Sequence, residues 1–277
     1  MTITRAATTQ PSTTEPSTTG YDDLGSSDPT LVLLPGWCGD RDVFDAMAAA
    51  LAAHHRVLVC DLRGHGGNAH QAGDFDSEQQ LDDLVALLDG RGVGCIVPVT
   101  LSHAGWFGIG LRRRLGAARV PGIVFVDWMV LGTPPGFTDA LAGLQDAQAW
   151  QQVRGALFGM WTEGVDSPAV HRYVGRMGSY GFDHWSRAGR EIAASFAAHG
   201  APLDALAGLD APSRALHLYA QPQDDGYLEA QQAAAARLGW FEVVRLDAHS
   251  HFPMLEDPEA VASHVTRFVT GLQGAVE

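Results

Sequence analysis

The chain has few cysteines, no long apolar run and a deficit of basic residues, and each absence narrows its possible functions. Three cysteines, Cys38, Cys60 and Cys95, form neither an even set for disulfides nor a C-x-x-C pair. A reducing compartment is therefore expected. No apolar stretch approaches the roughly 18 residues that a membrane-spanning helix needs, so we expect no membrane partner.

The charge balance points away from polyanionic partners. Eighteen basic residues stand against 32 acidic ones, which gives a formal net charge of -14. An excess of this sign argues against nucleic acid or an anionic membrane surface as a ligand and is typical of a soluble protein. The 277 residues are 46% hydrophobic, enough for one large globular core.

The first 29 residues are rich in Thr, Ser and Pro and contain a single arginine. They have no apolar segment of the kind that a secretory signal peptide requires, so residues 1–29 are predicted to be a flexible tail. With neither a signal peptide nor a membrane span, a cytoplasmic location is expected.

From Thr30 onward short apolar runs alternate with longer amphipathic segments, which predicts an α/β fold with a mostly parallel sheet and helices on both faces. Ser77, with Gln80 three residues later, is expected to start one helix through a capping box. The predicted strands are 30–34, 56–60, 95–100, 122–126, 214–219 and 241–246, and the predicted helices are 42–53, 77–88, 105–115 and 257–272.

Between Pro134 and Pro202 the pattern becomes helical, and Trp, Tyr and Phe are scattered through it. We interpret 134–202 as a helical cap inserted into a core formed by 30–133 and 203–277. The aromatic residues suggest an apolar, planar ligand, although a cap also needs a small core of its own. The sequence does not predict an oligomeric state.

An apolar strand breaks at a serine in Cys95-Ile-Val-Pro-Val-Thr-Leu-Ser-His-Ala-Gly-Trp106 and continues as a helix. A sharp strand-to-helix turn of this kind is a nucleophile elbow, which lifts Ser102 above the sheet beside two amides that can hold an oxyanion. The usual G-x-S-x-G frame is broken, because Thr100 and Ala104 replace its glycines. A scaffold built for acyl transfer can therefore host different chemistry here.

Ser102, Asp127 and His251 each follow a predicted strand, where ligands bind in open α/β sheets, and their order is that of the α/β-hydrolases. His249 competes with His251, but the stretch after His251 is the better match to the loop that leads into a last helix. A carboxylate beside the imidazole would fix its tautomer.

Two alternatives for the acid, Asp224 and Asp225, lie in the turn Gln221-Pro-Gln-Asp-Asp-Gly226, and we expect them to be solvated. The H-x-H spacing of His249 and His251 lacks a third ligand, so no metal site is predicted.

Leu34-Pro-Gly-Trp-Cys38 follows the first core strand, where hydrolases place the second amide of the oxyanion hole. The amides of Trp37 and His103 are therefore expected to converge on one site. Asp61-Leu-Arg-Gly-His-Gly66 is a glycine-rich turn to which we assign a structural role.

Six segments together resemble the cofactor-free ring-cleaving 2,4-dioxygenases of 3-hydroxy-4(1H)-quinolones, over about residues 30 to 272. They are Leu34-Pro-Gly-Trp-Cys38, Asp61-Leu-Arg-Gly-His-Gly66, Ser102-His-Ala-Gly-Trp106, Val126-Asp-Trp128, Trp161 and Ser250-His-Phe-Pro253. The pattern departs at Ala104, where glycine is expected.

The resemblance implies the α/β-hydrolase fold and a dioxygenase that uses neither metal nor flavin. His251, assisted by Asp127, would deprotonate the 3-hydroxyl of a 2-alkyl-3-hydroxy-4(1H)-quinolone, with methyl to heptyl as the alkyl group. The anion would react with O2 to give an N-acylanthranilate and carbon monoxide, and the heptyl case would quench a bacterial signal. Ser102 would orient a substrate oxygen, the Trp37 carbonyl would accept the ring N–H, and the pocket would be lined by His103, Trp37, Trp161, Trp106 and Trp185.

Two other functions fit the same residues. A serine hydrolase would use Ser102 as an acylated nucleophile with Asp127 and His251. A non-catalytic quinolone-binding protein would keep the pocket alone, although a receptor would not need all three residues.

Overall fold

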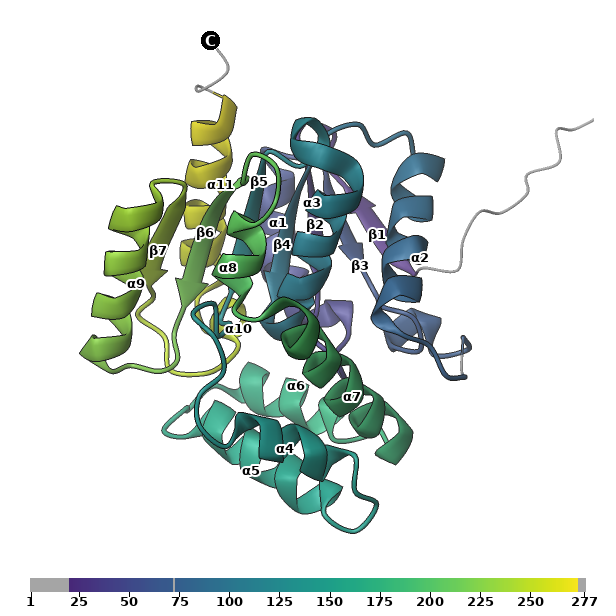
Figure 1. The fold of residues 1–277 in the computed structure, drawn as a ribbon. Coiled ribbons are helices and arrows are strands. Elements are labelled where there is room, and N and C mark those ends of the chain that lie inside the picture. Colours follow the sequence, from purple (N-terminus) through teal and green to yellow (C-terminus); the bar gives the residue numbers. More distant parts are fainter. Residues whose placement is uncertain (1–19, 72, 274–277) are drawn as a thin grey trace, which may run out of the picture.

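The computed structural model describes residues 20–71 and 73–273, which form a seven-stranded sheet in the order β1-β3-β2-β4-β5-β6-β7 (Figure 1). All neighbouring strands are parallel except β1, which runs antiparallel to β3. The strands are β1 Tyr21–Leu24, β2 Thr30–Leu34, β3 Val57–Cys60, β4 Ile96–Leu101, β5 Gly122–Val126, β6 Arg214–Tyr219 and β7 Phe241–Arg245.

The predicted α/β-hydrolase fold is confirmed, and β2 to β7 coincide with the six predicted strands within one residue at each end. Strands β2 to β5 are buried along their whole length, as expected for parallel strands covered on both faces.

Strand β1 differs from the sequence-based expectation, which placed residues 20–29 in a flexible tail. The structure instead pairs Tyr21–Leu24 with β3 at the edge of the sheet. Its sequence, Tyr-Asp-Asp-Leu, has little apolar character, because an exposed edge strand is held by backbone pairing and not by burial. Residues 1–19 of that expected tail lie outside the described residues.

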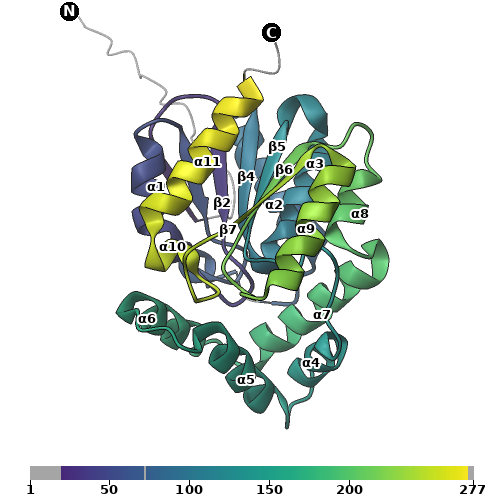
Figure 2. The same ribbon diagram turned by 90° about the vertical axis from the view of Figure 1, so that its left-hand side faces the viewer.

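Helices cover both faces of the sheet. Figure 2 shows α1 (Asp45–Ala52) and α11 (Pro258–Gln273) on one face, with α2 (Ser77–Gly90), α3 (Gly105–Arg119) and α9 (Asp225–Leu238) on the other. Four of these match predicted helices, although the first predicted helix begins as a 3-10 turn over Arg41–Phe44. Helix α9 was not predicted, because its run of alanines gives little amphipathic contrast.

The predicted capping box at Ser77 is wrong. Asp76 is the N-cap of α2, and its carboxylate accepts a hydrogen bond from the Gln79 amide at 2.8 Å. The Ser77 hydroxyl instead donates to Glu191, and the Gln80 side chain accepts from the Arg63 amide. Both side chains are engaged by tertiary partners, which override a local capping pattern.

Between β5 and β6 every regular element is a helix. The segment contains α4 (Phe137–Leu144), α5 (Trp150–Thr162), α6 (Pro168–Met177), α7 (Phe182–His199) and α8 (Pro202–Ala207). Helices α4 to α7 lie together beyond the carboxyl ends of the parallel strands (Figure 1). The predicted boundaries of core and cap stay a prediction. Among the described helices, none is both long and apolar enough to cross a bilayer.

Candidate active site

The elbow at Ser102 joins β4 to α3 through a 3-10 turn over Ser102–Ala104. Ser102 has a φ of 53°, a left-handed conformation that a non-glycine residue adopts at a cost of about 1–3 kcal/mol. Its side chain is half-buried, and no hydrogen bond to the hydroxyl is found in residues 20–71 and 73–273.

Two further left-handed residues follow neighbouring strands at the same edge of the sheet. Cys38, after β2, has a φ of 58°, and Asp127, directly after β5, has a φ of 47°. Of the four left-handed non-glycine residues in the described chain, three thus lie beyond strands β2, β4 and β5, which are adjacent. Backbone strain concentrated at one edge is typical of a functional site.

Asp127 and His251 form the central pair. The His251 Nδ1 atom lies 2.9 Å from Asp127 Oδ1, while Asp127 Oδ2 accepts from the amides of Ala220 at 2.7 Å and Gln221 at 3.0 Å. Both side chains are buried. The carboxylate therefore requires a proton on Nδ1 of His251. Nε2 then carries the lone pair, and it has no hydrogen-bond partner among the described side chains and backbone groups.

Contacts with Trp161 and Glu256 fix the loop of His251. The His251 amide donates to the Trp161 carbonyl at 3.2 Å, and the two rings stack with centroids 4.9 Å apart and an interplanar angle of 16°. The Glu256 carboxylate, in the short helix α10 (Pro253–Glu256), accepts from the Ser250 amide at 2.7 Å and from the His249 amide at 3.1 Å. The imidazole is thus held against the cap helix α5 on one side and by its own loop on the other.

Trp128 links the acid to the elbow. Its indole Nε1 donates to His103 Nδ1 at 3.0 Å, so the proton of a neutral His103 lies on Nε2. Burial, with a smaller contribution from His251, lowers the pKa of His103 to about 3 and keeps the ring neutral. The indole also lies directly on Gly105, where a Cβ would be 2.2 Å from two of its carbons. Glycine at this position of the elbow is what allows Trp128 to approach.

The Trp37 loop lies beside the elbow, because a Cβ on Gly36 would be 3.5 Å from the Ser102 Cβ. The next amide, that of Cys38, donates to His65 Nε2 at 3.1 Å, while His65 Nδ1 donates to the Arg63 carbonyl. The glycine-rich turn assigned a structural role therefore supports this loop. The Trp37 ring is 7% exposed and stacks on Phe75, with Phe107 on another side.

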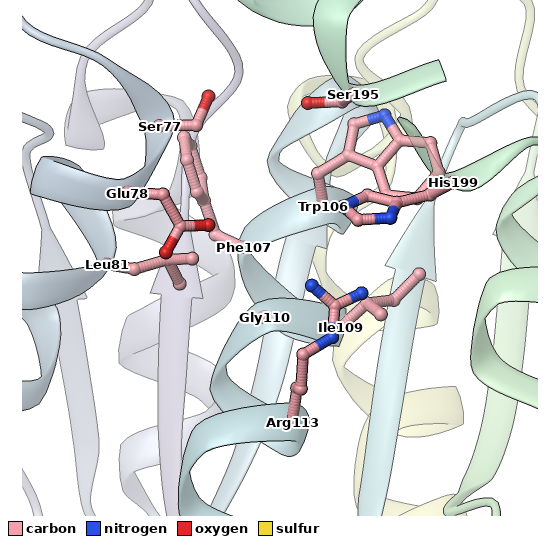
Figure 3. A pocket seen from close by; sticks show the side chains of 10 residues that line it. All are labelled: Ser77, Glu78, Leu81, Trp106, Phe107, Ile109, Gly110, Arg113, Ser195 and His199. Carbon is pink, nitrogen blue, oxygen red and sulfur yellow. The ribbon is translucent and has the colours of Figure 1, made fainter. Parts of the chain in front are cut away.

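Trp106 and Trp185 are separate from the Asp127–His251 pair. Trp185 is buried against Phe158, whose ring in turn contacts Trp161, and within residues 73–273 no hydrogen bond or direct ring contact joins Trp185 to Ser102 or the pair. Trp106 packs against Trp128 and lines a small cavity of about 30 Å³ between α2, α3 and α7 (Figure 3). That cavity includes none of the three expected catalytic residues.

The competing candidates lie in other environments. His249 is exposed, and its backbone atoms contact Glu256 and Gln221. Asp224 caps α9 by accepting from the Tyr227 amide, and Asp225 pairs with Arg245 at the surface. In the part of the chain that the structure describes, no group of three or more His, Cys, Asp and Glu side chains is arranged to hold a metal ion.

Glu256 and Gln221 contribute to the site but were not expected from the sequence. The Gln221 side chain donates to the carbonyls of Met160 and His249, and so connects the cap to the histidine loop. Gln221 acts on backbone groups 61 and 28 residues away in the sequence. Only the spacing of Glu256, six residues after Ser250, offered a local signal.

Comparison with known proteins identifies similar chains. The model of the alpha/beta hydrolase family matches residues 31–264. A 2-heptyl-3-hydroxy-4-quinolone dioxygenase of Rhodococcus erythropolis is 39% identical over 237 residues, which are 86% of this chain and 85% of the relative. A 1H-3-hydroxy-4-oxoquinoline 2,4-dioxygenase of Pseudomonas putida is 36% identical over 251 residues, 90% of this chain and 95% of the relative.

Solved structures of quinolone dioxygenases are also similar to this chain. The structure of a 1H-3-hydroxy-4-oxoquinoline 2,4-dioxygenase superposes with a TM-score of 0.86 at 35% identity, covering 91% of this chain and 96% of the other. An AqdC variant in complex with its substrate, the Pseudomonas quinolone signal, superposes with a TM-score of 0.88 at 33% identity, covering 92% and 98%. An esterase from Thermogutta terrifontis, at 22% identity and a TM-score of 0.72, shares the fold.

Proposed function

The chain belongs to the alpha/beta hydrolase family and, within it, to the 3-hydroxy-4-quinolone dioxygenases, and from that premise we propose the reaction that its site performs. The substrate is a 2-alkyl-3-hydroxy-4(1H)-quinolone, the second reactant is O2, and the ring is cleaved. The observation that carries the proposal is the buried Asp127–His251 pair, in which Nδ1 is committed to the carboxylate and Nε2 is free to take a proton.

His251 acts as a general base on the 3-hydroxyl of the substrate. A positioned general base contributes roughly 10²- to 10⁴-fold to a rate. Asp127 keeps the proton of the resting imidazole on Nδ1 and stabilises the imidazolium that forms. Two contacts support the orientation of Nε2: the Trp161 ring stacks on His251, and the His251 backbone amide donates a hydrogen bond to the Trp161 carbonyl.

The substrate anion supplies the electrons that reduce O2. A bond forms between C2 and one oxygen atom, and the peroxide then attacks C4. The O–O bond of the bicyclic peroxide breaks together with the two bonds to C3, so C3 leaves with its own oxygen as carbon monoxide. C2 becomes the acyl carbonyl and C4 the carboxylate of an N-acylanthranilate, each with one atom of O2, while the proton on His251 returns to solvent.

Ser102, Trp37 and His103 bind the substrate in this proposal. Ser102 orients a substrate oxygen by a hydrogen bond, the amides of Trp37 and His103 stabilise oxyanion character, and the Trp37 carbonyl accepts the ring N–H. The proximity of Gly36 to Ser102 supports a shared site for these groups. Trp161 and the neutral His103 form walls of the pocket, while Trp106 and Trp185 act on it indirectly, through the rings of Trp128 and Phe158 against which they pack.

We propose the heptyl compound as the preferred substrate within the range from methyl to heptyl, because several of the relatives are named for it. Cleavage of that compound in a cell would quench a bacterial signal. The cytoplasmic location expected from the sequence belongs to the same proposal and is tested by fractionating cells that produce the protein.

The decisive experiment mixes the purified protein with the methyl and the heptyl quinolone, in air and under argon, and measures carbon monoxide. We expect carbon monoxide to be released in air but not under argon, in an amount equal to that of the N-acylanthranilate formed. No carbon monoxide from either compound in air would refute the proposal.

A serine hydrolase is the second candidate, and the strained elbow at Ser102 favours it. Substitutions at Ser102 and His251 distinguish the two functions. If the protein is a dioxygenase, Ser102→Ala keeps substantial ring cleavage while His251→Ala does not. Hydrolysis instead predicts that a fluorophosphonate labels Ser102 and that Ser102→Ala abolishes turnover of esters.

A further inference from the structure

His217 is a fully buried histidine on β6 that the mechanism above does not use. It pairs in register with Phe125 of β5 and Val243 of β7, and its contact with Gln231 places the ring between the sheet and helix α9. Its Nε2 atom lies 3.1 Å from the Trp128 amide nitrogen, and its Nδ1 atom lies 2.5 Å from Gln231 Oε1 on α9. Gln231 is also fully buried.

The two partners determine the state of the ring. A backbone amide can only donate, so Nε2 must accept and carry no proton. Nδ1 then holds the single proton of the neutral ring and donates it to the Gln231 side-chain oxygen. Burial lowers the pKa of His217 to about 4, although the contacts with Gln231 and Asp127 act in the opposite direction. The acceptor for Trp128 is thus present at neutral pH.

The Trp128 amide needs this acceptor because the chain leaves the sheet at Asp127. The Asp127 amide makes the last bond to β6, to the Leu218 carbonyl at 2.8 Å, and the left-handed Asp127 then turns the next amide away from the strand ladder. Without the imidazole, the buried amide of Trp128 would be unpaired in the described structure.

The same turn carries two groups of the site. On one side the Asp127 carboxylate reaches His251, and on the other the Trp128 indole reaches His103. Both groups depend on the position of a single peptide unit, and its amide is bonded to His217.

We propose that His217 is a positioning residue that holds the Asp127–Trp128 turn and so sets both the Asp127–His251 pair and the tautomer of His103. The proposal rests on the proposed function for its kinetic consequences alone, since the positioning itself is a property of the resting protein.

The test compares His217→Phe with His217→Gln. Phenylalanine keeps the volume and the stacking on Tyr219, whose ring centroid is 5.2 Å away, but removes the acceptor. The longer glutamine side chain places an oxygen near the former Nε2 and restores an acceptor. Ser213→Ala is the matched control, because Ser213 directly precedes the same strand, and its hydroxyl accepts from Arg112 and donates to the Val120 carbonyl, away from the site.

In His217→Phe we expect kcat to fall by about 10- to 100-fold, the scale of a displacement of about 1 Å in a catalytic group, with little change in KM. The acid limb of the kcat/KM profile should move to lower pH, since the Asp127 carboxylate is no longer aligned with the imidazole of His251. His217→Gln should recover most of both properties. Ser213→Ala should lower the thermal midpoint and leave kcat and the profile unchanged.

A proton NMR resonance gives a readout that needs no turnover. The His251 Nδ1 proton in its bond to Asp127 should appear far downfield in the wild type and in His217→Gln, and should shift or vanish in folded His217→Phe. An unchanged resonance and an unchanged pH profile in His217→Phe would overturn the proposal. Equal losses of kcat in His217→Phe and His217→Gln would also overturn it. If the wild type releases no carbon monoxide, the proposed function fails, and the resonance still decides the role of His217.

Discussion

Replacing Asp127 by asparagine tests whether the Asp127 carboxylate fixes the tautomer of His251, with a change of one heavy atom. Asp127 Oδ2 accepts two amides, from Ala220 at 2.7 Å and Gln221 at 3.0 Å. In Asp127→Asn, only the amide oxygen can satisfy two donors, so it must take that position. The side-chain NH2 is then directed at His251 Nδ1, which is 2.9 Å from the present Oδ1.

Two donors cannot share this bond, so His251 must change its tautomer. It accepts at Nδ1 from Asn and carries its proton on Nε2, where the substrate needs a lone pair. The variant thus loses its base while its packing is preserved. We expect kcat for ring cleavage to fall by about 10²- to 10⁴-fold, the range that general base catalysis contributes.

The assay follows carbon monoxide release at saturating quinolone, and nitrogen NMR shifts of His251 report the tautomer. Asp224→Asn and Asp225→Asn are matched controls, since Asn also caps helices and the exposed Asp225–Arg245 pair is worth at most about 1 kcal/mol. An Asp127→Asn enzyme within about threefold of wild-type kcat would refute the assignment of His251 as an oriented base.

Three more outcomes follow from the structure. Burial lowers the pKa of His65 and His217 from 6.5 to about 4, and that of His103 to about 3. The unfolded chain therefore binds more protons than the folded protein below pH 6.5. These three histidines should together lower the free energy of unfolding by about 6 kcal/mol between pH 7.5 and pH 5, which urea titrations measure. A pH-independent free energy of unfolding over that range would contradict this. Gly105→Ala should displace the Trp128 indole, lower the free energy of unfolding by about 1–3 kcal/mol and raise KM through His103. If the variant keeps the KM and the stability of the wild type, the Trp128 ring can move aside without cost, which would contradict this prediction. Trp161→Leu should lower kcat by about 3- to 10-fold because His251 loses its stacked partner, Trp161→Phe should recover most of it, and identical rates for the two variants would argue against stacking.

The strands, and the positions of Ser102 and Asp127 directly after their strands, were predictable because their signals are local, while the catalytic roles stay a prediction. A buried parallel strand is a continuous apolar run, and a functional side chain in such a sheet follows its strand directly. Ser102 and Asp127 obey both rules, and the structure brings the carboxylate of Asp127 to His251, 124 residues later in the chain.

What the sequence could not predict depends on partners that are distant in the chain. Ser77 matches a capping pattern, yet its hydroxyl is bonded to Glu191, 114 residues later. Strand β1 is held by edge pairing with no apolar pattern. The sequence also could not predict that Trp185 packs against Phe158, because the immediate neighbours of an aromatic residue do not identify the ring that it contacts.

The most direct test of the central claim observes substrate ionisation before any oxygen reacts. Under argon, the absorption spectrum of the quinolone bound to the wild-type enzyme should be that of the 3-hydroxyl anion, and the bound quinolone should remain neutral in His251→Ala at the same pH. Admission of O2 should then consume the anion with release of carbon monoxide. A neutral quinolone in the wild-type complex, or an anion formed equally in His251→Ala, would contradict the account.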